Sequence, residues 1–381
     1  MKAIRKSSNL IIFLLVSQIV FGQAKMSIDE FIRNVKDYHP YIKITQNKLL
    51  KAEYKFKVAA GAFDPKLKAD WNYKSFGGKT YFDQRSAKVK ANTRLGISPI
   101  LKYQNNSGYY LNSENSNPDL GLIGAGVEVP ILNGLIIDES RRNYRIQKIN
   151  VQKQIFSNDS TENVIIANSL NSYIEWSVSY YKLKALDSLL QIRKLRYDNI
   201  LNLFRGGILP AMDTLDAFTQ LKKTEQELLF NKALYNKSLF KLQNYVWNPE
   251  YLDKLDSIVP DESYSLLLAL IIDKDVLDVA EHNFIKANRL REQQSKINIR
   301  FYAEQFKPKI NLELLPLAAL SEGVDGFSRN NFMTGVNIEL PLYYRKQTNY
   351  FKINKLELEN IKYQSDLLER KLNTSLNADR K

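Results

Sequence analysis

The longest unbroken segment of the sequence constrains the fold most. The 71 residues from Leu135 to Arg205 contain neither glycine nor proline, and one helix of that length would extend roughly 100 Å at about 1.5 Å per residue. Helices in globular proteins average about 11 residues. Three further segments without these helix breakers, residues 211–248, 261–307 and 342–381, are also predicted to be helical. We therefore expect very long helices to dominate the chain.

Segment 211–248 carries a stripe with alternating spacings of three and four residues, which is typical of a coiled-coil seam. The stripe consists of Phe218, Leu221, Glu225, Leu228, Lys232, Tyr235, Leu239, Leu242 and Val246. Leu229, Ala233 and Phe240 widen it, which suits a helix that touches two neighbours. An ordinary packed helical bundle would have the same periodicity.

The first 24 residues have the organisation of a secretory signal peptide. Three basic residues precede the apolar run 10–21, and Gly22-Gln23-Ala24 then supplies small residues for cleavage. A transmembrane anchor is the alternative, but the run is shorter than the ~20 residues that a bilayer requires. We predict an exported protein whose mature chain begins near Lys25.

Four segments between the predicted helices alternate apolar and polar residues, which is the period of a β-strand. They cover residues 66–74, 122–129, 309–314 and 333–340. A half-buried soluble sheet produces this pattern. So does a transmembrane barrel, whose strands place apolar residues toward lipid and polar residues toward water, with aromatic residues at the interfaces. The export signal and aromatic residues such as Trp71 favour the barrel.

Composition argues against several functions. The sequence has no cysteine and two histidines, so thiol chemistry is excluded and a histidine-based catalytic or zinc centre is nearly so. No nucleophile with a base and no cluster of carboxylates is evident, so we predict no enzyme, no metal and no cofactor. The net charge of +14 is dispersed along an exported chain, which argues against a nucleic-acid partner.

The order of the predicted elements repeats along the chain. Aligning residues 39–66 with residues 282–309 gives six identities, and residues 124–130 resemble residues 335–341. Each unit runs helix, proline, strand, variable middle, strand, proline, long helix, which indicates an internal duplication.

We expect this duplication to set the domain boundaries. The signal peptide would occupy residues 1–24, the first structural repeat residues 25–262 and the second residues 263–381. Prolines are expected at the junctions of strands and helices, because proline ends one backbone geometry and begins another. These junction residues are Pro65, Pro130, Pro308 and Pro341.

The second repeat is shorter than the first. About 40 residues follow Pro341, whereas about 130 residues of the first repeat follow Pro130. The returning partner of the second long helix is therefore expected to be missing. Either the chain is truncated or its helices are arranged differently.

Four features in order carry a family resemblance: the His39-Pro40 step, a helix ending at Pro65, the strand end 126–130 followed by Asn133-Gly134, and the segment from Gly206 to Ala217. Together they resemble the TolC family of outer membrane efflux proteins over nearly all of the predicted mature chain. The resemblance implies an internally duplicated α+β membrane protein that forms a homotrimer. Each protomer would give about four strands to a shared antiparallel transmembrane β-barrel and its long helices to a coiled-coil α-helical barrel in the periplasm.

The resemblance also implies a function. The chain would be the outer membrane duct of a tripartite efflux system, and it would passively conduct substrates from an inner-membrane pump across the periplasm and outer membrane. Its partners would be two further copies, a periplasmic adaptor (membrane fusion) protein, the pump and outer membrane lipid. A periplasmic coiled-coil adaptor or a structural protein of an export complex is the alternative, although an adaptor should lack paired strands with aromatic girdles.

Two sets of site residues follow from the resemblance. The polar strand faces are expected to line the barrel lumen, with Lys66, Lys68, Asp70, Lys74, Glu128, Lys309, Glu313 and Glu339 as candidates. The break between two long helices is expected to be the hairpin tip that docks the adaptor, formed by Arg205, Gly206, Gly207, Ile208, Leu209, Pro210 and Asp213. Both glycines can adopt left-handed conformations, and Asp213 can cap the next helix. The alternatives are ordinary solvated charges and a plain turn.

Overall fold

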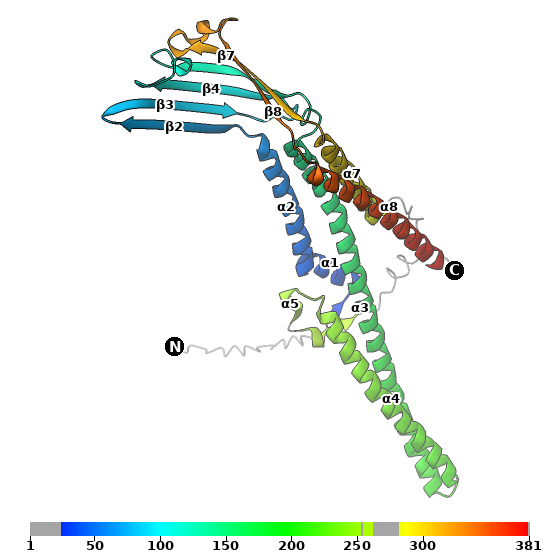
Figure 1. The fold of residues 1–381 in the computed structure, drawn as a ribbon. Helices are drawn as coiled ribbons and strands as arrows, with labels where there is room; N and C mark the ends of the chain where they lie inside the picture. The colour runs from blue at the N-terminus through cyan, green and yellow to red at the C-terminus, as the bar shows by residue number, and fades with distance from the viewer. Residues whose placement is uncertain (1–23, 253, 262–281, 380–381) are drawn as a thin grey trace, which may run out of the picture. The chain divides into compact units, whose positions relative to one another are not determined.

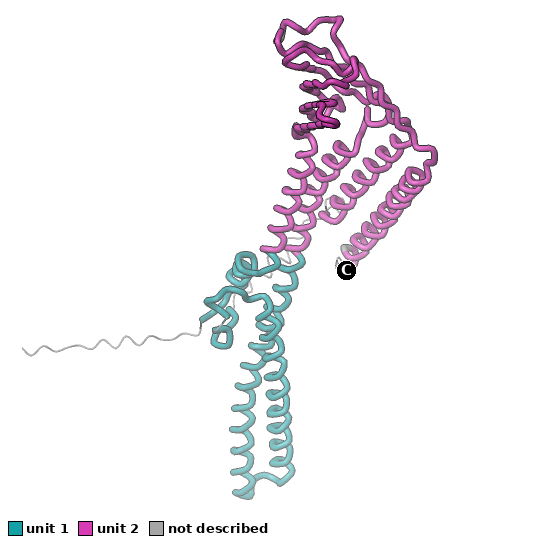
Figure 2. The backbone as a smooth tube through the Cα atoms, turned by 60° about the vertical axis from the view of Figure 1, so that its left-hand side comes forward, with its two compact units in different colours: residues 1–42, 164–273 teal, residues 43–163, 274–381 magenta. Residues whose placement is uncertain are grey.

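The computed structural model of the chain describes residues 24–252, 254–261 and 282–379. Residues 1–23 of the predicted signal peptide and residues 262–281 of the predicted helix 261–307 lie outside this description. The chain divides into two compact units (Figure 2), one from residues 1–42 and 164–273 and the other from residues 43–163 and 274–381. The duplication boundaries concern sequence repeats and stay a prediction.

Long helices make up most of the described chain (Figure 1). The α-helices are α1 (Ile28–Tyr38), α2 (Pro40–Ala60), α3 (Glu139–Arg205), α4 (Ala211–Gln243), α5 (Pro249–Leu252), α7 (Asn283–Glu304) and α8 (Arg345–Asp379). Because α3 has 67 residues and α8 has 35, the prediction of very long helices is confirmed. Within the described residues, none of these helices is both long and apolar enough to cross a bilayer.

The strands form two sheets. Their bounds are β1 (Lys25–Met26), β2 (Lys66–Phe76), β3 (Lys79–Lys90), β4 (Ser98–Ser107), β5 (Leu122–Pro130), β6 (Val259–Pro260), β7 (Lys309–Ala319) and β8 (Phe332–Glu339). β1 and β6 pair in parallel, and the other strands form a six-stranded antiparallel sheet in the order β2-β3-β4-β5-β7-β8.

The expectation of about four strands in the main sheet is wrong, because β3 and β4 also belong to it. Asp83 and Arg85 occupy apolar-face positions of β3, so its alternation is broken in the sequence. Pro99 and Asn105 do the same in β4. Pairing with neighbours on both sides holds these two strands in the sheet despite their weak pattern.

The unit that contains α1, α4 and the second half of α3 has a conventional hydrophobic core. Trp176, Phe31 and Leu242 are completely buried in it. The β1 strand is fixed to this core, because the Tyr173 hydroxyl donates to the Met26 carbonyl at 2.7 Å and Met26 itself is buried. Burial of such large side chains stabilises this unit against unfolding.

The other unit contains the six-stranded sheet, with helices that pack in pairs. Asn288 of α7 donates its side-chain amide to the Ile361 carbonyl of α8 at 3.2 Å, and the Ser295 hydroxyl donates to the Asn354 carbonyl at 3.1 Å. In the same unit, Asn158 of α3 donates to the Thr45 carbonyl of α2 at 2.8 Å. These small polar residues allow close helix approach while their own polar groups stay satisfied.

Candidate functional site

The register of the main sheet places most of its charged side chains on one face, because directly paired residues of neighbouring strands share a face. We call this the polar face. Its charged residues are Lys66, Lys68, Asp70, Lys74, Lys88, Lys90, Lys102, Glu128, Lys309, Glu313 and Glu339. The set contains all eight predicted lumen candidates. Lys88, Lys90 and Lys102 were missed because β3 and β4 were not recognised, although Lys88 and Lys90 already had the period of two.

The polar face is concave. Lys88 Nζ lies 3.2 Å from the Glu313 carboxylate, although β4 and β5 separate their strands. In a flat sheet with strands about 4.8 Å apart, these two backbones would be roughly 14 Å apart, beyond comfortable reach of the side chains. Lys90 Nζ likewise reaches the Glu128 carboxylate at 2.6 Å across β4. The sheet therefore curls around its polar face.

Glycine permits a close approach at the centre of this curl. A Cβ atom on Gly126 would lie 2.0 Å from the Leu314 carbonyl oxygen of β7, and one on Gly124 would lie 2.7 Å from a methyl carbon of Leu315. Leu315 is completely buried against this part of β5. Any larger residue at position 126 would have to push the two strands apart.

The opposite face of the sheet is apolar and exposed, and we call it the apolar face. Its large apolar residues are 36–71% exposed, and they are Leu67, Trp71, Tyr73, Leu101, Val127, Leu312, Leu314, Val336 and Ile338. One polar cluster interrupts it, in which Asp83 accepts from Trp71 Nε1 at 2.9 Å and from Arg85 at 2.7 Å. An apolar surface of this size requires an apolar environment or a partner.

The sheet also has two open edges. Among the described strands, β2 pairs only with β3, and β8 pairs only with β7. Each edge strand therefore leaves backbone N–H and C=O groups on its outer side for pairing with another strand.

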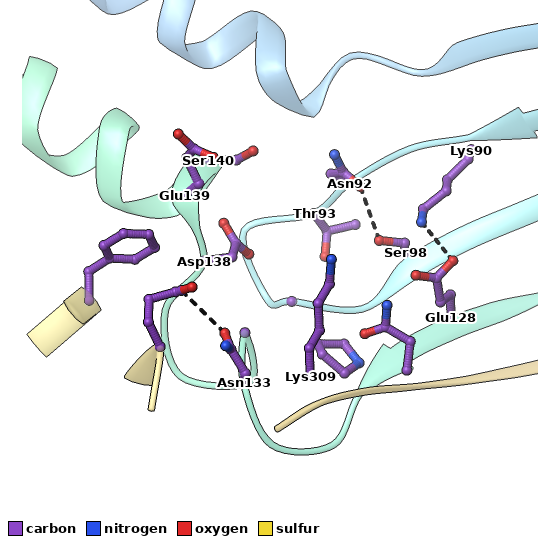
Figure 3. A pocket seen from close by; sticks show the side chains of 16 residues that line it. Lys90, Asn92, Thr93, Ser98, Glu128, Asn133, Asp138, Glu139, Ser140 and Lys309 are labelled. Carbon is purple, nitrogen blue, oxygen red and sulfur yellow. Dashed lines mark hydrogen bonds and ion pairs between the residues drawn. The ribbon is translucent and has the colours of Figure 1, made fainter. Parts of the chain in front are cut away.

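A polar pocket of about 360 Å³ lies where the strands meet α3 and α7 (Figure 3). Lys90 and Glu128 form an ion pair on its wall, and Asn133 accepts from the Gln305 amide at 3.3 Å. Within the described residues, no three histidine, aspartate or glutamate side chains converge as a metal site would require. The pocket is lined mainly by polar atoms that water can solvate.

The turn beside this pocket determines where α3 begins. The Asp138 carboxylate accepts from the Arg141 backbone N–H at 2.8 Å and from Arg141 Nε at 2.7 Å. Arg141 is buried and also donates to the carbonyls of Leu135 and Gly134. Asp138 therefore ends the turn and caps the helix, so α3 begins four residues later than predicted.

The four junction prolines lie at or near the ends of β2, β5, β7 and β8. Pro65 and Pro308 immediately precede β2 and β7, Pro130 is the last residue of β5, and Pro341 follows β8 by two residues.

At the other predicted site, α3 ends in a hydrogen-bonded turn before α4. Ile208 N–H donates to the Leu203 carbonyl and Gly207 N–H to the Phe204 carbonyl, both at 2.9 Å, which is the Schellman arrangement. Gly207 has a φ of +72° there. The prediction that both glycines adopt the left-handed conformation is wrong for Gly206, because Gly206 occupies the helix end before the reversal.

The predicted capping role of Asp213 is also wrong. Pro210 occupies the N-cap position of α4 with extended backbone angles and makes no side-chain cap. Asp213 lies inside the first turn, where its N–H donates to the Pro210 carbonyl at 3.2 Å. A carboxylate there still interacts favourably with the positive end of the helix dipole.

The hairpin tip exposes large apolar side chains. Ile208 is 70% exposed and Met212 is 72% exposed, and Leu215 and Phe204 are also exposed. The tip residues Arg205, Gly206, Gly207 and Leu209 surround them in one short turn. A cluster of exposed apolar side chains is typical of a surface that contacts another molecule.

The seam of α4 differs from the predicted stripe at alternate positions. The predicted residues Leu221, Leu239, Leu242 and Val246 are buried, whereas Phe218, Leu229 and Phe240 are exposed. The buried positions between the leucines are the small or polar residues Ala217, Thr224, Asn231 and Ser238. They recur every seven residues and lie one position before four residues of the predicted stripe, Phe218, Glu225, Lys232 and Leu239. At one of them, the Ser238 hydroxyl lies 2.6 Å from that of Ser179 on α3.

Comparison with protein-family models finds no match, and neither does comparison with curated proteins. Solved structures give clear matches. The Campylobacter jejuni CmeC outer membrane channel has 12% identity and a TM-score of 0.58, with 92% of this chain and 68% of that chain covered.

The outer membrane protein VceC from Vibrio cholerae has 14% identity and a TM-score of 0.57, with 91% of this chain and 76% of that chain covered. The open state of the Neisseria gonorrhoeae MtrE outer membrane channel has 12% identity and a TM-score of 0.55, with 90% and 70% covered. The predicted combination of long helices with an antiparallel sheet is thus confirmed, and the chain has the TolC-type fold of these outer membrane channels.

Proposed function

We propose that this protein is an outer membrane efflux duct, with its sheet in the membrane and its long helices in the periplasm. One observation carries the proposal: the sheet gathers its charges on the concave side and exposes its apolar residues on the convex side. This sorting is the reverse of a soluble sheet, and it suits a wall with lipid outside and water inside.

The open edges support assembly from several copies. An edge with unpaired backbone groups is not tolerated in lipid, so β2 of one copy would pair with β8 of the next. A homotrimer of six-stranded sheets would give a barrel of about 18 strands, a size at which porins leave an aqueous channel. Substrates would pass through this barrel passively.

The hairpin tip would dock the periplasmic adaptor of an inner-membrane pump. The exposed side chains of Ile208 and Met212 support this role, since they offer an apolar contact that neither α3 nor α4 covers. Docking by Arg205 to Pro210 and Asp213 would complete a tripartite export system in which the pump supplies the energy.

The test uses the natural absence of cysteine, which makes introduced thiols unambiguous. Lys68→Cys on β2 and Asn337→Cys on β8 lie on opposite edges of one sheet, so a disulfide between them has to join different copies. We expect covalent trimers in the outer membrane fraction of cells that carry both substitutions. Each single-cysteine variant is a control and should give no covalent trimer.

A soluble periplasmic monomer without crosslinks, or crosslinked species larger than three copies, would contradict this assembly. Loss of adaptor crosslinking after substitution of Ile208 and Met212 by serine, with trimers retained, is the expected result for the tip.

A further inference from the structure

The polar face carries an excess of positive charge. Up to the bulge between Lys74 and Ser75, this face holds seven lysines but only four carboxylates. The charges that break the alternation on the apolar face, Asp83 and Arg85, balance each other at 2.7 Å. Up to the bulge, the excess therefore lies on one side of the sheet.

Ion pairing uses every carboxylate of the polar face. The pairs are Lys68–Asp70 at 3.3 Å, Lys88–Glu313 at 3.2 Å, Lys90–Glu128 at 2.6 Å and Lys309–Glu339 at 3.6 Å. Three lysines are left over. Among the described residues, Lys66 and Lys102 have no carboxylate within ion-pair distance, and Lys74 instead lies 4.9 Å from the ring centre of Tyr81.

The register of the sheet shows what lies beside two of the three leftover lysines, Lys102 and Lys66. Lys102 lies in the middle of β4, directly paired with Lys88 on one side and with Gly124 on the other. Since glycine has no side chain, nothing from β5 covers Lys102 at this register. Lys66 is paired with Lys90 at the helical end of the sheet, so the excess of lysine extends to that end.

We propose that the concave wall makes the channel selective for anions, so that the substrates of this duct are small acidic organic molecules. The inference rests on the proposed function, because the wall filters solutes only if it surrounds a water-filled path. Like charges gathered on a curved wall with low-dielectric surroundings create a potential that raises the local concentration of counter-ions. Repetition of the excess in every copy would add to this potential around the ring.

The test is the reversal potential of the purified full chain in planar bilayers under a KCl gradient at low ionic strength, where screening is weak. We expect a chloride-to-potassium permeability ratio above one. Lys66→Glu combined with Lys102→Glu should bring the ratio below one. The control is Lys36→Glu, which reverses one charge at an exposed position on α1, and it should leave the ratio unchanged.

A ratio below one for the unmodified chain would overturn the inference, as would equal shifts in the double variant and the control. A second measurement covers the case in which no current is seen, which would count against the proposed function. Binding of a trisulfonated pyrene dye to the detergent-solubilised protein should weaken in the double variant and not in the control. Equal binding by all three proteins would overturn the charge inference even without conduction.

Discussion

The core around Trp176 and the six-stranded sheet use the same kinds of side chain in opposite ways. Around Trp176, aromatic and aliphatic residues face one another and exclude water, and Trp176 is completely buried. In the sheet, Trp71 is 70% exposed, and the enclosed side holds ion pairs instead. One region therefore buries its large apolar side chains and the other exposes them, so the same substitution should have different effects in the two.

The tryptophans give the largest expected contrast. Trp176→Ala leaves a cavity in a closed core and should cost about 3–5 kcal/mol of unfolding free energy. Trp71→Ala removes an exposed ring and should change the stability of the same core by less than about 0.5 kcal/mol. Amide hydrogen exchange in α1, measured in detergent, reports on the core directly. Equal loss of protection in both variants would break the comparison.

Adjacent residues of β8 test the two faces of the sheet. Val336 lies on the apolar face and Asn337 on the polar face. Val336→Arg should reduce membrane insertion by up to about 2–4 kcal/mol, because it places a charge against lipid, whereas Asn337→Arg faces water and should be tolerated. The measurement is the heat-modifiable folded fraction in outer membranes. If Asn337→Arg were the more damaging change, our assignment of the faces would be reversed.

The two tip glycines refine the comparison within the helical region. Gly207→Val forces a β-branched residue into a positive φ and should cost about 1–3 kcal/mol locally. Gly206→Ala should be neutral or stabilising by up to about 1 kcal/mol, because the new Cβ meets only ordinary contacts at 3.5 Å or more and the helix end gains propensity. Hydrogen exchange at residues 200–215 separates them, and membrane insertion should be unchanged in both. Similar exchange in the two variants would argue against the Schellman turn.

The smallest expected effect is a pH dependence near the core. Burial lowers the pKa of His39, and this outweighs the hydrogen bond to the Asn244 backbone, which raises it. The unfolded chain therefore takes up a proton before the folded chain does, so stability should be full above pH about 6.5 and fall as the pH drops below that value. His39→Gln should remove this part of the slope in denaturant unfolding between pH 5 and 7. An unchanged slope would assign the pH dependence to other groups.

The sequence was most informative where periodicity and environment agree. Segments without glycine or proline predicted α3, α4 and α8 to within a few residues, and strict alternation predicted β2, β5, β7 and β8. The sequence prediction failed where a polar residue occupies a position that the hydrophobic pattern assigns to an apolar one. Thr224 and Asn231 are buried in the α4 seam, and Asp83 and Arg85 sit on the apolar face because each neutralises the other. The placement of such residues depends on their pairing and packing partners in the folded chain, and the hydrophobic pattern of the sequence does not reveal those partners.

The same distinction separates the residues of the candidate sites that could be predicted from those that could not. All eight lumen candidates share one face, because a period of two needs only the local sequence. The role of Lys102 depends on its pairing with Gly124, and that neighbour is known only once β4 is placed in the sheet. The capping of α3 by Asp138 was equally hidden, since Arg141 completes it from within the helix.

The ion pair between Lys88 and Glu313 has a consequence for how many copies can assemble. By joining β3 to β7 over two intervening strands, it sets the arc that one chain subtends. In the proposed assembly, a ring closes only when a whole number of equal arcs completes one turn, so the bend of each sheet would limit the number of copies before any two chains meet. Relaxing that bend would not simply loosen the ring; it would favour a wider one with a different stoichiometry.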